Sequence, residues 1–163
     1  PAKDWLEPTE MDLVWASIEG IPDLSMLFML EGCMGLRRCE VRRLTLMDIG
    51  PEFIRVIGKG RNGGKPRKVR KHPEFDAVFQ IYLEHRDGIV RRALMDNHLL
   101  IEPDGLMLCY HMGRLTICQR TALDRMMDRM RKAAGIHFSH HWLRRALVGV
   151  CGCRVFDWRS LRT

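Results

Sequence analysis

Residues 22–32 constrain the fold more than any other stretch, because apolar side chains occupy nearly every side of the helix expected there. Pro22 stands near the start of this helix, where proline is favoured. The run over residues 24–30 then leaves almost no polar face. Such a helix is stable in water only when other elements cover it. We therefore expect it at the centre of the domain.

A group of arginines follows this central stretch. A short helix is expected over residues 36–44, in which Arg37, Val41 and Leu44 share one face by their i, i+4, i+7 spacing. Because Val41 and Leu44 belong in the core, Arg37 is expected to point inward, whereas Arg38 is expected to point to water. A buried guanidinium is costly without an anion. The sequence therefore predicts a negative group beside Arg37, either a carboxylate of the protein or a phosphate of a ligand.

The chain has 163 residues, enough for one domain with a substantial core, and a single domain is expected over residues 1–163. Apolar periodicity predicts helices over residues 10–19, 22–32, 36–44, 73–83, 89–95, 116–134 and 140–147. Alternating residues of high β-propensity predict a hairpin of strands over 53–57 and 67–70. Residues 99–101 and 106–110 are either short strands or merely extended. The expected fold is mainly α with a small antiparallel β-sheet, an α+β domain.

The balance of charges is basic, with a formal net charge of +7 at pH 7. Hydrophobic residues make up 46% and charged residues 29% of the chain, which is typical of a globular and not a disordered protein. A basic surface favours nucleic acid or another acidic surface as a partner. No apolar run approaches the length needed to cross a membrane, so no membrane partner is expected.

The six cysteines include no Cys-x-x-Cys pair. Without a signal peptide or a disulfide-like spacing, we expect reduced thiols in an intracellular protein. One zinc site is conceivable, from His140, His141, Cys151 and Cys153, but structural zinc sites usually have more closely spaced ligand pairs. We therefore expect neither a metal ion nor another cofactor.

Three clusters of side chains could act on a phosphate, and each also has a purely structural interpretation. Arg37 and Glu40 are either an ordinary helical ion pair or part of an anion site. The segment 58–65, Gly-Lys-Gly-Arg-Asn-Gly-Gly-Lys, is either a solvated hairpin tip or a basic tip that enters a nucleic-acid groove. His141 and Arg144, three residues apart on an expected helix, are either surface residues or a proton-transfer group beside a phosphate clamp.

In chain order these clusters contain Gly-Leu-Arg-Arg-Cys-Glu, then Ile-Gly-Lys-Gly at the end of a strand, then His-His-Trp-Leu-Arg-Arg at the start of a late helix. This order resembles the catalytic domain of the tyrosine recombinase, or phage integrase, family over about residues 6–145. That family has a T/M-G-L-R-x-x-E box, an I-x-G-K-G hairpin with a basic return strand, and an H-x-L-R-H/R box. The resemblance implies the family's catalytic-domain fold and the site-specific cleavage and rejoining of DNA through a 3′-phosphotyrosyl intermediate, as in DNA integration and excision.

The resemblance also implies roles for single residues. Arg37 and Arg144 match the arginines that hold the non-bridging oxygens of the scissile phosphate. Lys59 matches the hairpin lysine that protonates the leaving 5′-hydroxyl, and His141 matches the histidine placed for proton transfer. Glu40 matches a residue that supports the arginine helix without taking part in the chemistry. The family needs no metal ion, because its arginines supply the positive charge.

Further basic residues are expected to contact DNA or to support the site. The expected DNA contacts of the hairpin are Arg61, Lys65, Arg67 and Lys68. Arg145, which stands where many members of the family have histidine, is expected to be a supporting residue of the site. The expected partner is double-stranded DNA, with self-association on DNA in the complete protein, and the expected location is the cytoplasm, at nucleoid or host-cell DNA.

The chain departs from the family pattern after Arg145, where no Leu-Gly-His box and no tyrosine follow. Tyr82 lies in an apolar stripe and is expected in the core, and nothing places Tyr110 near Arg144. We therefore expect a chain without the N-terminal core-binding domain and the C-terminal tyrosine segment, which holds DNA but does not form the phosphotyrosyl bond by itself. The alternatives are a catalytically inactive DNA-binding relative or remnant, and a basic helical protein whose arginines pair internally and bind no DNA.

Overall fold

The protein is described by a computed structural model that covers residues 2–150. Its helices are α1 (Pro8–Ile18), α2 (Pro22–Phe28), the π-helix η1 (Met29–Cys33), α3 (Arg38–Arg43), the 3-10 helix η2 (Leu46–Asp48), α4 (Phe75–Met95), α5 (Arg120–Ala134) and α6 (His140–Val150). Its strands are β1 (Phe53–Ile57), β2 (Pro66–Arg70), β3 (Leu99–Leu100), β4 (Leu108–His111) and β5 (Arg114–Ile117). The domain is therefore helical with small sheets, as the sequence predicted.

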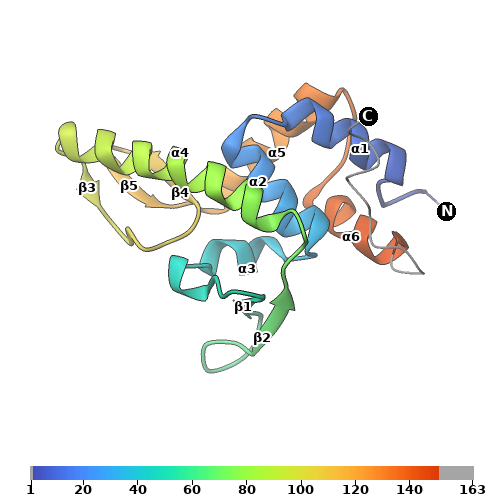
Figure 1. Cartoon of the computed structure of the whole chain (residues 1–163), viewed down its shortest axis with the longest axis horizontal. Helices are drawn as coiled ribbons and strands as arrows, with labels where there is room; N and C mark the ends of the chain where they lie inside the picture. The colour runs from blue at the N-terminus through green and yellow to red at the C-terminus, as the bar shows by residue number, and fades with distance from the viewer. Residues whose placement is uncertain (1, 151–163) are drawn as a thin grey trace.

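The helix α2 and its continuation η1 lie at the centre of the domain, between α4, α5 and α6 (Figure 1). Every residue from Leu24 to Gly32 is buried, which confirms the prediction of a central helix. The prediction of one regular α-helix over 22–32 is wrong at its end, because residues 29–33 form a π turn. Turns of this kind often occur at functional sites. Here the wider turn leads directly into the arginine-rich segment.

The hairpin of β1 and β2 forms as predicted, with Phe53 opposite Arg70 and Ile57 opposite Pro66. Ile54 and Val56 are buried, so one face of the hairpin packs on the core. The loop between the strands closes tightly at Gly64, whose backbone has φ +89°. A Cβ atom there would lie 2.1 Å from the carbonyl oxygen of Gly58. This close approach requires glycine, and it fixes the base of the basic loop.

The second sheet was only partly predicted. Strand β5 lies between β3 and β4, parallel to β3 and antiparallel to β4. Residues 116–119 were expected to begin a long helix, which instead begins at Arg120. The missed signal is the two-residue turn Met112-Gly113, in which both residues have positive φ, as a tight hairpin requires.

Helix α4 is continuous through Gly88, so the predicted break there is also wrong. A single glycine costs a helix only about 1 kcal/mol relative to alanine, and tertiary contacts offset this. Arg86 is 4% exposed and supplies such a contact. Its guanidinium donates hydrogen bonds to the carbonyl oxygens of Pro103, Gly105 and Leu106, which join α4 to the loop before β4.

Tyr82 lies in the core, as predicted. Its hydroxyl donates to the carbonyl oxygen of Leu106 at 2.9 Å and accepts from the backbone N–H of Leu108 at 3.4 Å. Burial raises the pKa of this phenol far above its ordinary value. Tyr82 is therefore a structural residue that joins α4 to β4.

We expect Tyr82→Phe to lower the free energy of unfolding by about 1–2 kcal/mol, because it removes a buried hydrogen bond and leaves the N–H of Leu108 without its acceptor. Urea unfolding followed by circular dichroism measures this loss. Tyr110→Phe is the matched control, because that hydroxyl donates to the carbonyl oxygen of Ile89 at an exposed position. Equal losses in the two variants would contradict a special role for Tyr82.

Candidate nucleic-acid interface

Arg37 stands at the start of α3 and not within it. Gly35 has φ +72°, a left-handed turn that favours glycine, and Arg37 then has the extended backbone of an N-cap residue. The backbone N–H of Arg37 donates to Glu40 Oε2 at 3.3 Å, which places a carboxylate in the first helical turn. The side chain of Arg37 is 48% exposed. The prediction that Arg37 points into the core with Val41 is therefore wrong. The helix begins at Arg38 and not at residue 36, so Arg37 lies before its first turn.

Glu40 is the negative group that was predicted beside Arg37. Its side chain has no exposed area, and it accepts hydrogen bonds from two arginines, Arg37 Nη1 at 3.0 Å and Arg67 Nη2 at 2.6 Å. Burial alone raises the pKa of Glu40, but the hydrogen bonds from Arg67 and Arg37 outweigh it and hold the pKa below its ordinary value. Glu40 therefore stays ionised and joins β2 to the start of α3.

Arg144 comes to the same place from α6. Ser139 caps this helix as predicted, and its Oγ accepts from the N–H of Trp142 at 3.3 Å. Arg144 Nε donates to the carbonyl oxygen of Gly35 at 2.8 Å. Its terminal nitrogens form no hydrogen bond with residues 2–150. The bond to the Gly35 carbonyl places Arg144 beside the segment that leads into Arg37, two residues after Gly35. Burial, and then the positive charge of Arg37, lower the pKa of Arg144.

Part of the hairpin completes a basic hollow beside Arg37. This hollow, hereafter the arginine site, is lined by Arg37, Glu40, Gly58, Lys59, Lys65, Pro66 and Arg67, with Arg144 adjacent to it. Arg43 on α3 donates to the carbonyl oxygen of Gly58 at 3.0 Å and ties the hairpin to the helix. Among these charged residues Glu40 is the one carboxylate, so the arginine site carries a surplus of positive charge. Such a surplus attracts an anion.

The other hairpin residues lie further out. Arg61 is exposed in the loop between the strands. Lys68 is opposite Arg55, whereas Arg67 is opposite the buried Val56. Because successive side chains alternate between the two faces of a strand, Arg67 faces Glu40 and Lys68 faces away from it. The structure therefore brings Lys59, Lys65 and Arg67 to the arginine site and leaves Lys68 on the opposite face.

Two residues of the late box lie on the outside of α6. His141 is exposed and forms no hydrogen bond or ion pair with the described part of the chain, three residues before Arg144. Arg145 is half exposed and forms an ion pair with Asp4, which ties α6 to the segment before α1. Tyr110 is on β4, at the far end of the molecule from α6 (Figure 1).

His140 was considered only as a zinc ligand in the sequence. In the structure its ring nitrogens bond to Glu31 and Asp124. No group of three or more possible ligands that could hold a metal ion occurs among the described residues, and Cys151 and Cys153 lie outside them. The pairing of His140 with a glutamate 109 residues away has no signal in the sequence.

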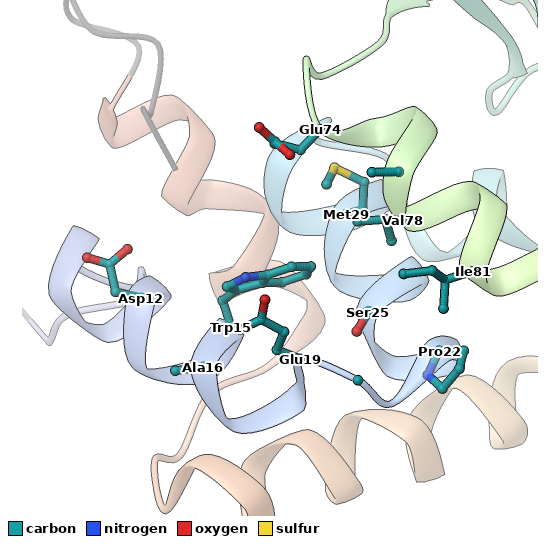
Figure 2. A pocket seen from close by; sticks show the side chains of 12 residues that line it. Asp12, Trp15, Ala16, Glu19, Pro22, Ser25, Met29, Glu74, Val78 and Ile81 are labelled. Carbon is teal, nitrogen blue, oxygen red and sulfur yellow. The ribbon is translucent and has the colours of Figure 1, made fainter. Parts of the chain in front are cut away.

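A second hollow lies between α1, α2 and α4 (Figure 2). Its walls are mainly apolar, from Trp15, Met29, Val78 and Ile81. Its polar groups include three carboxylates, Asp12, Glu19 and Glu74, and burial raises the pKa of Asp12. Negative groups repel phosphate, so this hollow does not compete with the arginine site for an anion.

No helix within residues 2–150 is long and apolar enough to span a membrane.

The solved structures that match this fold include the XerA recombinase, the XerH site-specific recombinase and lambda integrase. The domain therefore has the fold of a tyrosine recombinase catalytic domain, as its sequence predicted. Neither a protein-family model nor a curated protein sequence matches the chain.

Three structures show the extent of the similarity. XerA recombinase superposes with a TM-score of 0.69 at 19% identity, over 94% of this chain and 53% of that one. The XerH site-specific recombinase bound to its palindromic difH substrate gives 0.67 at 19% identity, over 91% of this chain and 42% of that one. The lambda integrase catalytic core gives 0.52 at 17% identity, over 89% of this chain and 81% of that one. This chain thus spans about half the length of the Xer recombinases.

We expect Glu40→Gln to lower the free energy of unfolding by about 2 kcal/mol at neutral pH, because it removes the charge that Arg37 and Arg67 share. The folded-state pKa of Glu40 lies below its ordinary value. Its contribution is therefore complete above the ordinary value and is lost as the pH falls through the lowered one. Urea unfolding at about pH 7 and about pH 3 should show the difference between wild type and variant shrinking at acid pH.

The control is Glu19→Gln, because Glu19 is exposed and its side chain forms no hydrogen bond or ion pair with residues 2–150. We expect a change within about 0.5 kcal/mol at both pH values. A Glu40→Gln effect that stayed constant between the two pH values would show that the ionised carboxylate is not its source.

Proposed function

We propose that this chain is a DNA-binding domain of the site-specific tyrosine recombinase type, and that the arginine site holds a DNA phosphate. The observation that carries the proposal is that Arg37 and Arg144, from two distant segments, come together beside the buried carboxylate of Glu40. Within residues 2–150 the terminal nitrogens of Arg144 form no hydrogen bond, and Arg37 is half exposed. Guanidinium groups of this kind bind phosphate oxygens in pairs.

The proposed chemistry follows from the positions of the charges. When a nucleophile attacks a DNA phosphate, negative charge gathers on the two non-bridging oxygens, and preorganised cations stabilise it. Arg37 and Arg144 are assigned to these oxygens. Glu40 keeps Arg37 oriented through its hydrogen bond and does not touch the substrate. The arginines supply the charge stabilisation that a divalent metal ion supplies in other phosphoryl-transfer sites.

Proton transfer is assigned to Lys59 and His141. Lys59 lies in the lining of the arginine site, at the start of the hairpin loop, where its ammonium can protonate a leaving 5′-hydroxyl. His141 is exposed one turn before Arg144 on α6. Lys65 and Arg67 in the hollow, and Arg61 and Lys68 further out, are proposed to contact the DNA backbone, and Arg145 to support α6 through Asp4.

We do not assign the nucleophile to either tyrosine of this chain. The Tyr82 hydroxyl is buried in the core, and the Tyr110 hydroxyl bonds to the carbonyl oxygen of Ile89. Neither lies at the arginine site. As an isolated chain, the domain is proposed to bind DNA without forming a phosphotyrosyl bond, either as part of a recombinase or as an inactive relative. Self-association on DNA belongs to the complete protein, and the place of action is nucleoid or host-cell DNA in the cytoplasm.

A second candidate is a purely structural role for the arginines. Arg37 and Arg67 already share Glu40, so their charges are partly neutralised within the protein. In that case the protein would bind no DNA, or would bind it with an affinity that hardly changes with salt. A phosphate clamp predicts the opposite, because each neutralised phosphate releases counterions.

We expect Arg37→Ala and Arg144→Ala each to weaken binding to a mixed-sequence DNA duplex about tenfold and to reduce the slope of log affinity against log salt by about one. Fluorescence anisotropy of a labelled duplex over a series of salt concentrations measures both quantities. Circular dichroism of each variant confirms that the domain remains folded.

Arg129→Ala is the matched control. It removes the same charge, but Arg129 pairs with Asp23 at the opposite end of α2 from the arginine site. It should therefore leave the affinity within about twofold of wild type. If all three variants bound alike, the assignment of Arg37 and Arg144 to a phosphate would be lost.

A further inference from the structure

Glu31 is a buried acid that the proposed chemistry does not use. It lies in the π turn η1 and is 1% exposed. A buried carboxylate is unfavourable unless other groups compensate its charge or it takes up a proton. Burial accordingly raises the pKa of Glu31, against the opposing effect of His140. The position therefore requires an explanation beyond packing.

The partner of Glu31 is His140, the first residue of α6. Its Nδ1 lies 2.7 and 2.9 Å from the two carboxylate oxygens of Glu31. Its Nε2 lies 3.1 Å from Oδ1 of Asp124 on α5, and the same oxygen accepts from Arg38 on α3. The result is a chain of contacts, Arg38–Asp124–His140–Glu31, which joins α3, α5, α6 and η1. We call it the histidine network.

Hydrogen bonds from both ring nitrogens of His140 to carboxylates need two protons, and a neutral ring supplies only one, so the histidine network needs one further proton. If both carboxylates are ionised, the ring must donate from both nitrogens and is an imidazolium. If Glu31 is protonated instead, a neutral ring accepts from Glu31 and donates to Asp124. Both arrangements satisfy the observed distances. Loss of the proton leaves a neutral ring with one N–H between two ionised carboxylates. Whichever ring nitrogen lacks the hydrogen, Nδ1 toward Glu31 or Nε2 toward Asp124, then faces a carboxylate oxygen with its lone pair, and that contact becomes repulsive.

The histidine network lies directly behind the arginine site. His140 and Arg144 are four residues apart, so they share a face of α6. Arg144 bonds to the carbonyl oxygen of Gly35, just after the turn that carries Glu31. Helix α6 therefore contacts Glu31 of η1 through His140, and the segment just after η1 through Arg144, one turn of α6 further on. At its other end the network reaches Arg38, the neighbour of Arg37 in the chain.

We propose that His140 is a positioning residue for the arginine site, and that the proton it shares with Glu31 keeps Arg37 and Arg144 aligned for one phosphate. This inference rests on the proposed function. The charged groups that face His140 are Glu31 from η1 and Asp124 from α5, with Arg38 from α3 behind Asp124, whereas α1 contributes the apolar Met11 to the contact of η1 with α6. DNA affinity should fall as the pH rises, because deprotonation breaks the alignment.

The first test is the pH dependence of DNA binding in wild type and Glu31→Gln. A glutamine amide donates to the Nδ1 of a neutral His140 without needing a titratable proton. In a series of buffers from about pH 5 to about pH 9, we expect the affinity of wild type to fall with rising pH by about tenfold and that of Glu31→Gln to fall much less. Because His141 is present in both proteins, it contributes equally to both profiles. Identical pH profiles would overturn the shared-proton role.

The second test is a double-variant cycle of DNA affinity with His140→Ala and Arg144→Ala. If His140 acts through Arg144, each single variant loses about tenfold and the double variant loses no more than Arg144→Ala alone. Losses that multiply would overturn the positioning role. Where His140→Ala does not fold, as judged by circular dichroism, His140→Gln takes its place in the cycle.

The outcomes separate this inference from the proposed function. If Arg144→Ala weakens binding but the pH profiles coincide and the cycle is additive, the arginine site stands and the positioning role is wrong. If Arg144→Ala leaves binding unchanged, the phosphate site itself is wrong and the positioning role is lost with it.

Discussion

The buried carboxylate of Glu40 determines the form of the site. It lies between Arg37 at the start of α3 and Arg67 on β2, and its position in the first turn also caps the helix. One side chain therefore sets where the helix begins, which way Arg37 points and where the hairpin lies. An apolar residue at this position would remove this contact between α3 and β2. The domain accepts a buried charge because two partly exposed guanidiniums compensate it.

The backbone of residues 29–37 provides the second constraint. The π turn of η1 and the left-handed turn at Gly35 direct a main-chain carbonyl toward α6, where Arg144 binds it. A carbonyl group has no rotamers of its own, so this contact fixes Arg144 more firmly than a bond between two long side chains. The main chain of residues 29–37 thus provides the acceptor that positions Arg144, although the two segments are distant in the chain.

The sequence predicted the features that depend on local pattern. The central helix, the β1–β2 hairpin and a negative group beside Arg37, left open between a carboxylate and a ligand phosphate, were predicted from spacing and composition. The inward direction assigned to Arg37 was wrong because helical periodicity does not apply to a residue outside the helix. Strand β5 was missed because its turn lacks the usual Asn-Gly signal. The contact between Glu31 and His140 could not be predicted, because it spans 109 residues and neither residue has a local signature.

The loop between β1 and β2 would lose conformational entropy if its residues became fixed on a ligand. Residues 59–63 are exposed, and no side chain of residues 59–64 forms a hydrogen bond with residues 2–150. Restricting such residues on a ligand costs conformational entropy, about 1–2 kcal/mol for each residue that becomes fixed. This cost would reduce the net binding free energy contributed by contacts from Lys59 or Arg61. Arg37 and Arg144 are already held by the fold and would not incur it. In the proposed complex, Arg37 and Arg144 would therefore provide most of the affinity, and the loop would reach groups whose position varies from one ligand to another.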